Sequence, residues 1–505
     1  MLFNSHIFML LFLPLLLAGW YFLNWKKKFQ LAQGYLIGMS LWFYAYANLQ
    51  YLWLLLFSCL IGWLLSCLPE KISLEKGKKV LTGVGCVFHL GLLGYFKYSN
   101  FFLENLNTAF HTDFPMLQIL LPVGISFYTI QQLAYLIDRC RKDAPRDSFF
   151  DYLTFMVYFP QLLQGPILLR SEFMEQLKEP ERRRFHAERF SEGIQFFVFG
   201  LAKKVLLADT LAKAVNYGYS NVSMLDSISA LLLAVGYLTE LYFDFSGYCD
   251  MAVGLGKMIG LEVAENFDAP FHSASVKEFW RRWHMTLGRF FTRYVYIPLG
   301  GNRRGKMRTL CNVMIVMLLS GLWHGAAWTF VLWGFLHGVG MIWDNLEHPH
   351  LPKKWMRQAA TFAYVCMTFV FFRAESIEQG VDVLKSIVSL KWNGFVFQMA
   401  SALDLTEFYM ITKALSMKLP GLLSWFWLGI FVVLIAICFR VLSGEKVSGV
   451  VALQRQKGYG RLYPVLLAVL FTWSMISMTG VSEYLYFSFS RENGGSMICP
   501  GQCEE

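Results

Sequence analysis

Apolar residues along this chain occur in long runs, and the runs are separated by short polar stretches. Runs of roughly 20 apolar residues, the length that crosses about 30 Å of hydrocarbon, lie at 3–23, 29–48, 50–68, 79–97, 116–138, 191–212, 226–245, 309–325, 328–346, 357–373, 423–441 and 462–480. The pattern predicts an all-α polytopic membrane protein with about 11 or 12 transmembrane helices. The first run lacks a basic start and a small-residue cleavage site, so we expect it to be a retained membrane segment.

One further apolar segment, 149–169, is interrupted by Pro160, Gly165 and Pro166. Irregular backbone at membrane depth is stable only where protein or a water-filled cavity covers it. We therefore predict that this segment is re-entrant and does not span the membrane.

The basic loops alternate with the apolar runs. Lys and Arg gather at 26–28, 76–79, 139–142, 170–190, 277–308, 353–357 and 446–461. Segments 98–115 and 214–225 carry almost no Lys or Arg. By the positive-inside rule, the basic loops are cytoplasmic. The N-terminus, the loop 374–422 and the C-terminal tail then lie outside.

Composition supports a membrane protein and argues against nucleic acid as a partner. Only 16% of residues are charged, compared with about 25% in soluble domains. The net charge of +10 arises from the basic loops, whereas the aromatic residues lie in the apolar runs. No cysteine pair has zinc-finger spacing, and we expect no metal site. Cys499 and Cys503 could form a disulfide only in an oxidising compartment.

The stretch "YFDFSGYCDMAVGLGKMIG" places Asp244 and Asp250 in apolar surroundings beside several glycines. Acids within a membrane are costly, so they are usually functional or paired. Gly254, Gly256 and Gly260 resemble a dinucleotide-binding loop, but the last spacing is one residue too long and no strand precedes them. We predict instead that Gly256 and Gly260 let helices approach closely.

A basic and aromatic stretch runs from 278 to 308. It holds eight Arg or Lys from Arg281 onward, with no acid among them, and His284 lies close to two tryptophans. One interpretation is an interfacial helix on anionic lipid head groups. The other is that arginines receive a phosphate-rich ligand from the cytoplasm. The candidates for that role are Arg281, Arg282, Arg289, Arg303 and Arg304.

The apolar stretch "SGLWHGAAWTF" contains His324. A lone histidine on an apolar face is commonly a hydrogen-bonded core residue, but an unpaired imidazole in lipid costs several kcal/mol. Trp323 and Trp328 are its expected aromatic neighbours, and His337 points elsewhere if one helix continues through both histidines. The sequence lacks a G-x-S-x-G elbow, an H-E-x-x-H zinc motif and a Walker loop. A histidine base within a membrane remains as the candidate chemistry.

Six motifs together resemble the membrane-bound O-acyltransferase (MBOAT) family, in particular the bacterial branch that acetylates alginate and related exported polysaccharides. They are "LGYFKYSNFF", "LLPVGISFYTIQQLAYLID", "FPQLLQGPI", "LYFDFSGYCDMAVGLGKMIG", "FWRRWHMTLGRFFTRYVYIPLGGNRRG" and "GLWHGAAWTFVLWGFLHG". The resemblance implies a ring of helices around a central tunnel, formed by residues 1–490, with an exported tail at 491–505. Residues 374–460 match no motif of the family.

The resemblance also implies roles for single residues. The family's near-invariant histidine matches His324, which would act as general base, and a second polar position matches His284. We expect four further residues to line or support the tunnel: Asp244, Asp250, Trp323 and Trp328.

The substrates and partners implied by the resemblance lie on both sides of a bacterial cytoplasmic (inner) membrane. The acyl donor is a cytoplasmic thioester, either acetyl-CoA or an acyl carrier protein, and no bound cofactor is expected. Membrane lipids surround the chain, and an extracytoplasmic acetyltransferase of the SGNH type receives the acyl group. Two alternatives stay open: transfer of D-alanine to teichoic acid, and a lipid or polysaccharide channel.

The C-terminal stretch "YLYFSF" resembles an aromatic motif that ends many members of the bacterial branch, with Tyr486 in the tyrosine position. It departs from that motif at Tyr484, Leu485 and Ser488, and a longer tail follows. In the family the tyrosine accepts the acyl group and passes it outward. The competing interpretation is an aromatic belt at head-group depth.

Overall fold

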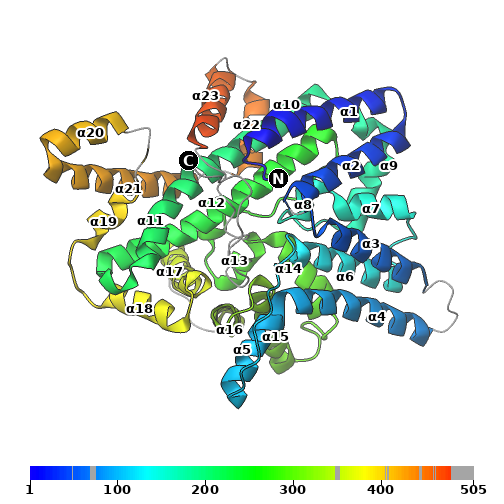
Figure 1. Cartoon of the computed structure of the whole chain (residues 1–505), viewed down its shortest axis with the longest axis horizontal. Coiled ribbons are helices and arrows are strands. Elements are labelled where there is room, and N and C mark those ends of the chain that lie inside the picture. The colour runs from blue at the N-terminus through cyan, green and yellow to red at the C-terminus, as the bar shows by residue number, and fades with distance from the viewer. Residues whose placement is uncertain are drawn as a thin grey trace. The chain divides into compact units, whose positions relative to one another are not determined.

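A computed structural model describes residues 1–47, 49–68, 75–346, 353–403, 405, 409–442, 446–458, 460 and 462–478. These residues form helices and loops, and no strand occurs among them (Figure 1). The all-α prediction is therefore confirmed. The chain divides into two compact units, and it passes from one to the other within α10, within α12 and between residues 264 and 265.

The first unit comprises residues 1–190 and 256–264, together with residues beyond the described part of the chain. Its α-helices are α1 (Leu13–Trp25), α2 (Phe29–Ala47), α3 (Leu52–Cys67), α4 (Glu75–Leu93), α5 (Ser99–Phe110), α6 (Ile125–Arg141), α7 (Phe149–Val157), α8 (Phe159–Leu162) and α9 (Arg170–Lys178). A π-type turn, η1 (Phe8–Phe12), precedes α1. Within this unit α4 packs on α6, and α1 packs on α2.

The second unit comprises residues 191–255 and 265–482. Its helices are α10 (Ala187–Ala202), η5 (Lys203–Ala208), α11 (Asp209–Ser220), α12 (Ser227–Ile259), α13 (Val276–Arg282), α14 (Met285–Phe291), α15 (Lys306–His324), α16 (Trp328–Asn345), α17 (Lys354–Arg373), α18 (Ile377–Val388), α19 (Phe395–Ser401), α20 (Tyr409–Lys418), α21 (Pro420–Leu442), α22 (Val447–Lys457) and α23 (Leu462–Ser477). In the described part of the predicted outer loop 374–422 lie α18, α19, α20 and the start of α21. The predicted runs 309–325 and 328–346 coincide closely with α15 and α16.

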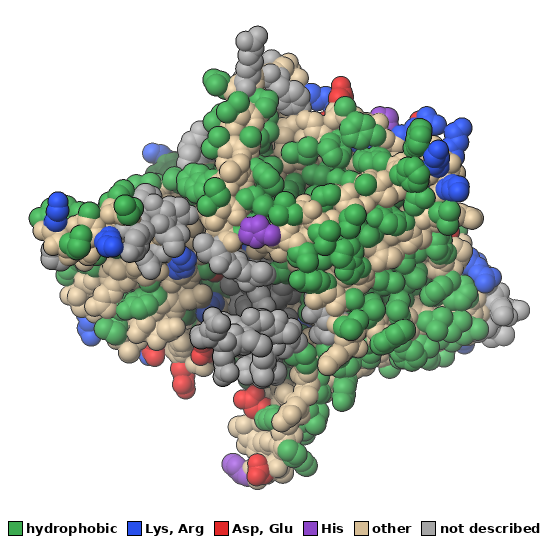
Figure 2. All heavy atoms as spheres, turned by 45° about the horizontal axis from the view of Figure 1, so that its top comes forward, with side chains coloured by type: hydrophobic (Ala, Val, Ile, Leu, Met, Phe, Trp, Pro, Cys, Tyr) green, Lys and Arg blue, Asp and Glu red, His purple; other side chains and the backbone are tan. Residues whose placement is uncertain are grey.

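Among the described residues, five helical stretches are long and apolar enough to cross a membrane. They are Phe8–Trp25, Lys76–Phe110, Ser227–Ile259, Lys306–His324 and Gly421–Phe439, and α3 and α23 are shorter apolar helices. The chain is therefore a multi-pass membrane protein, whereas the total of 11 or 12 spans stays a prediction. In the first unit large apolar side chains are exposed, for example Trp25 at 70%, Trp53 at 73% and Val87 at 70%. Figure 2 shows hydrophobic side chains over much of one face, with most of the visible Lys and Arg near its edges.

The predicted interruption of 149–169 is confirmed. Helix α7 ends before Tyr158, α8 has a single turn, and the following residues are not helical until α9. This segment is nevertheless buried, with Gln161 and Gln164 at 0% and 1% exposure. At Gly165 a Cβ would collide with the backbone oxygen of Pro160, so the turn requires glycine. Protein covers the irregular backbone, as its place in an apolar run requires.

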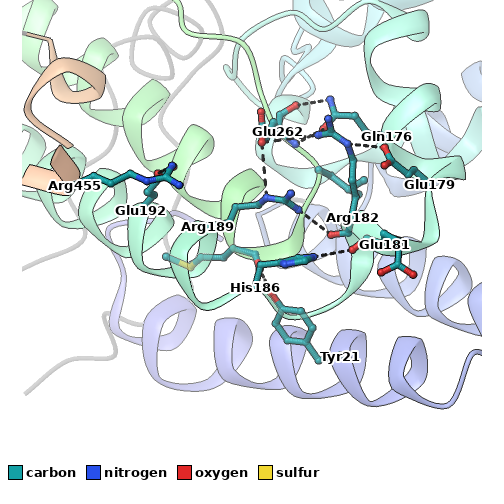
Figure 3. A network of polar contacts seen from close by, with 12 residues as sticks. Tyr21, Gln176, Glu179, Glu181, Arg182, His186, Arg189, Glu192, Glu262 and Arg455 are labelled. Carbon is teal, nitrogen blue, oxygen red and sulfur yellow. Dashed lines mark hydrogen bonds and ion pairs between the residues drawn. The ribbon is translucent and has the colours of Figure 1, made fainter. Parts of the chain in front are cut away.

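Polar contacts attach segment 256–264 to α9, to the turn that follows it and to the start of α10 (Figure 3). The backbone N–H of Glu262 donates to Gln176 Oε1 at 2.7 Å, and Gln176 Nε2 donates back to the Glu262 carbonyl at 3.2 Å. Arg182 and Arg189 each lie 3.9 Å from a carboxylate oxygen of Glu262. Two of the basic residues of stretch 170–190 therefore lie close to an acidic side chain of the protein itself.

The close helix contacts assigned to Gly256 and Gly260 lie partly elsewhere. It is Gly254 of α12 that meets α10, since a Cβ there would lie 2.6 Å from the Gly193 carbonyl oxygen. Gly256 faces the turn that follows α12 itself. Gly260 does allow a close approach, because a Cβ there would collide with the backbone of Arg182, and its φ is +80°. The prediction for Gly256 is wrong because α12 ends three residues later.

Candidate functional site

A helical hairpin positions His324 at its tip. Helix α15 ends at His324, residues Gly325 and Ala327 are extended, and α16 begins at Trp328. The two helices pack against each other along their length. Gly321 and Gly334 allow this approach, since a Cβ at either position would collide with the backbone of the other helix. Gly321 of α15 and Gly334 of α16 thus allow the hairpin to close.

Aromatic rings surround His324, which is 8% exposed. Its ring centroid lies 5.0 Å from Trp323, 5.2 Å from Trp333 and 5.2 Å from Phe372. The rings meet it edge to face, which is the preferred geometry for such pairs. Trp328 begins the next helix, so the expected helical spacing from His324 does not apply. Trp328 is 56% exposed.

His284 lies beside His324, with 6.4 Å between the two ring centroids. It occupies the short turn between α13 and α14, outside the five spanning stretches, and is 1% exposed. Burial lowers the pKa of His284 to about 3, because an imidazolium would lose its hydration there. Its Nδ1 lies 3.2 Å from Asn266 Oδ1, and its Nε2 has no hydrogen-bond partner among the described residues. A neutral, buried imidazole with a free ring nitrogen suits acid–base chemistry.

His337 is buried near the same place but is fully hydrogen-bonded. Trp280 Nε1 donates to its Nδ1 at 3.3 Å, and its Nε2 lies 2.9 Å from Thr368 Oγ1. Because the chain turns back after His324, both His324 and His337 pack on Trp333, at 5.2 and 4.9 Å. His337 was expected to point elsewhere only if one helix continued through both histidines, and the chain does not meet that condition. Its satisfied nitrogens indicate a packing role.

The two intramembrane acids are ion-paired with neighbouring lysines. Lys204 Nζ lies 2.6 Å from Asp244 and 2.7 Å from Asp209, and Lys203 Nζ lies 2.6 Å from Asp250. The acids stand out in the sequence, whereas these lysines were not predicted as their partners, although "AKK" inside the run 191–212 was a visible signal. These contacts support the paired alternative for both acids.

The arginines proposed to bind the donor have different surroundings. Arg282 Nη2 forms an ion pair with Glu278 at 2.9 Å, so its charge is partly neutralised. Arg281, Arg303 and Arg304 are exposed, and Arg289 is half-buried. Tyr486 lies outside the described residues. No cluster of residues able to hold a metal ion occurs in the part of the chain that the structure describes.

Spanning helices and a buried pair of histidines define a multi-pass membrane protein with a candidate site for acid–base chemistry. Residues 145–377 match the model of the membrane-bound O-acyltransferase family. The chain is 36% identical over 423 residues to a peptidoglycan O-acetyltransferase of Helicobacter pylori, covering 77% of this chain and 80% of the relative. It belongs to the membrane-bound O-acyltransferase family and is an acyltransferase.

Two further relatives with different named activities are similar to this chain to different extents. A protein of Azotobacter vinelandii named "probable alginate O-acetylase" is 39% identical over 390 residues, covering 75% of this chain and 76% of the relative. A teichoic acid D-alanyltransferase of Bacillus subtilis is 29% identical over 269 residues, covering 50% and 68%. The resemblance found in the sequence is thereby confirmed.

Proposed function

We propose that this enzyme moves an acetyl group from a cytoplasmic thioester across the bacterial inner membrane, for O-acetylation of an exported cell-envelope polysaccharide such as alginate or peptidoglycan. The observation that carries the proposal is the pair formed by His284 and His324, whose rings lie 6.4 Å apart in buried surroundings. Two relatives named for O-acetylation match three quarters of the chain or more.

The proposed step is transfer of an acyl group from sulfur to oxygen. The hydroxyl attacks the thioester carbonyl, a C–O bond forms, the C–S bond breaks, and the hydroxyl proton passes through a histidine to the sulfur. His324 acts as general base, and His284 assists it by accepting a hydrogen bond. Burial keeps water away from the thioester and so limits its hydrolysis.

The donor enters beside the basic stretch 281–308. Its exposed arginines, Arg281, Arg303 and Arg304, suit the phosphates of coenzyme A through charge-assisted hydrogen bonds. The same surface would suit an acidic carrier protein. On the outer side, Tyr486 accepts the acyl group and passes it to an SGNH-type transferase, because a phenol is a good leaving group once acylated. Mass spectrometry should find an acetylated Tyr486 that is absent from His324→Ala, and full polymer acetylation by Tyr486→Phe would exclude this relay.

The test of the proposal is acyl transfer from radiolabelled acetyl-CoA by the purified chain in liposomes. His324→Ala and His284→Ala should each lower the rate by roughly 10²–10⁴-fold. His337→Gln is the matched control, because it keeps a donor near Thr368, and it should stay within a few fold of wild type. Loss of folded protein instead of activity would favour packing roles for His324 and His284.

Two outcomes would favour the alternatives. Transfer from a D-alanyl carrier protein but not from acetyl-CoA would indicate teichoic acid D-alanylation. Absence of transfer from any thioester, together with movement of lipid or polysaccharide through the liposome membrane, would indicate a channel.

A further inference from the structure

Asn266 lies in the connection between α12 and α13, and it is 1% exposed. Its single side-chain oxygen faces three groups: Thr286 N at 3.1 Å, Thr286 Oγ1 at 2.9 Å and His284 Nδ1 at 3.2 Å. Its main-chain oxygen accepts a further hydrogen bond from Met285 N at 3.0 Å. Asn266 therefore holds the first turn of α14 and the histidine that precedes it.

These contacts decide which nitrogen of His284 carries the proton. The backbone N–H of Thr286 can only donate, so the amide of Asn266 must present its oxygen there, and its Nδ2 then points to Cys249 Sγ at 3.4 Å. The same oxygen faces His284 Nδ1, which must therefore be the protonated nitrogen. A neutral imidazole has only one N–H, so Nε2 keeps its lone pair.

The backbone of His284 is held in an unusual conformation. Its φ and ψ are 45° and 51°, the left-handed region that residues other than glycine seldom adopt. Such a conformation persists only where the surroundings impose it. Here they are the hydrogen bonds of Asn266 and a backbone hydrogen bond from Asp268 N to Arg282 O at 2.9 Å. The direction of the ring is thus set by segment 266–268.

We propose that Asn266 is a positioning residue for acyl transfer, which fixes His284 in the tautomer whose Nε2 is the hydrogen-bond acceptor of the histidine pair. The inference rests on the proposed function of that pair. The competing explanation is purely structural, since Asn266 also caps α14 through Thr286. Both explanations predict that Asn266→Ala lowers stability, so that variant alone cannot separate them.

Asn266→Asp separates the two explanations. The substitution keeps the shape and the acceptor oxygen, but its negative charge beside Nδ1–H favours the imidazolium and raises the pKa of His284. A protonated Nε2 can no longer accept a hydrogen bond. We expect the acid limb of the kcat profile to move to higher pH by about one unit or more, with KM little changed and the rate recovering as pH rises.

Thr286→Val is the matched control. It removes another hydrogen bond of the same Asn266 oxygen and leaves the one to His284 in place, so the acid limb should stay where it is in the wild type. Melting curves in detergent establish that each variant is folded. A wild-type pH profile in folded Asn266→Asp, or an equal shift in Thr286→Val, overturns the inference. Absence of acyl transfer by the wild type overturns the proposed function instead.

A direct measurement remains decisive if Asn266→Asp does not fold. Nitrogen-15 NMR of histidine-labelled wild type, with the His284 signals assigned through His284→Gln, reports which nitrogen carries the proton. We expect protonated Nδ1 and unprotonated Nε2. Protonated Nε2 overturns the inference.

Discussion

His284 and His337 are both buried, but their ring nitrogens have different surroundings. His337 has a partner at each ring nitrogen, whereas Nε2 of His284 has none among the described residues. An unsatisfied polar atom in an apolar interior costs free energy, so it persists where selection requires it or where a ligand completes it. The partners of the ring nitrogens therefore distinguish His337, which packs, from the candidate His284.

The low pKa of His284 links folding stability to pH. The folded protein keeps this group neutral down to about pH 3, whereas the unfolded chain binds a proton below about 6.5. Between these values the unfolded state holds more protons, so stability is greatest above pH 6.5 and falls as pH decreases, by at most about 1.4 kcal/mol per unit. Melting temperatures of wild type and His284→Gln in detergent should converge as pH falls from 7 to 5. A constant difference would contradict this origin.

The buried lysine of η5 should be important for stability. Lys204→Met removes the ammonium group that pairs with Asp244 and Asp209, and breaking such a buried pair costs about 3–5 kcal/mol. Chemical unfolding in detergent measures the loss. Lys385→Met is the control, because its ion pair with Asp382 is exposed at 71% and 58% and should contribute less than about 1 kcal/mol. Equal effects of the two substitutions would show that Lys204 has no special role.

At the scale of the elements, the α15–α16 hairpin determines where His324 lies. Its contact depends on glycines that leave no room for a side chain. Gly321→Ala should destabilise the protein by about 1–3 kcal/mol or more, because the added Cβ meets the immobile backbone of Phe330. Unfolding in detergent and acyl transfer should both be impaired.

Gly338→Ala is the matched substitution in the same hairpin. There the added Cβ comes closest to the side-chain sulfur and methyl of Met314, which can move, and it lies at ordinary contact distance, 3.5 Å, from Met317 Cβ. We expect near wild-type stability. If Gly338→Ala is as damaging as Gly321→Ala, close backbone contact is not what holds the hairpin.

At the scale of the whole molecule, the proposed direction of transfer requires the basic stretch 277–308 to be cytoplasmic. In a background with Cys311, Cys499 and Cys503 changed to serine, Asn302→Cys should be protected from impermeant thiol reagents in intact cells. Asp113→Cys should react with them, because segment 98–115 is expected outside. Both positions are exposed to solvent. The reverse labelling pattern would place the donor side outside, where coenzyme A thioesters are absent.

Local patterns in the sequence are sufficient to predict the class of protein, the positions of many helices and the two histidines. Apolar run length decides membrane insertion because each spanning helix satisfies its own backbone hydrogen bonds, so α15, α16 and α21 could be located without tertiary information. The break in 149–169 was visible for the same reason, since Pro160 and Gly165 act locally on the backbone. The family motifs then identified His324 and His284.

The way these residues are used depends on contacts that form when the helices pack. The pairing of Asp244 with Lys204 joins positions far apart in sequence. The same is true of the contacts of Asn266 and His337. No local pattern specifies these contacts or the turn after His324. His324 and His337 are thirteen residues apart in the sequence. Because the chain turns at Gly325, both of them contact Trp333. Hydrogen-bond partners and ion pairs depend on distances in space, and these arise only when the helices pack.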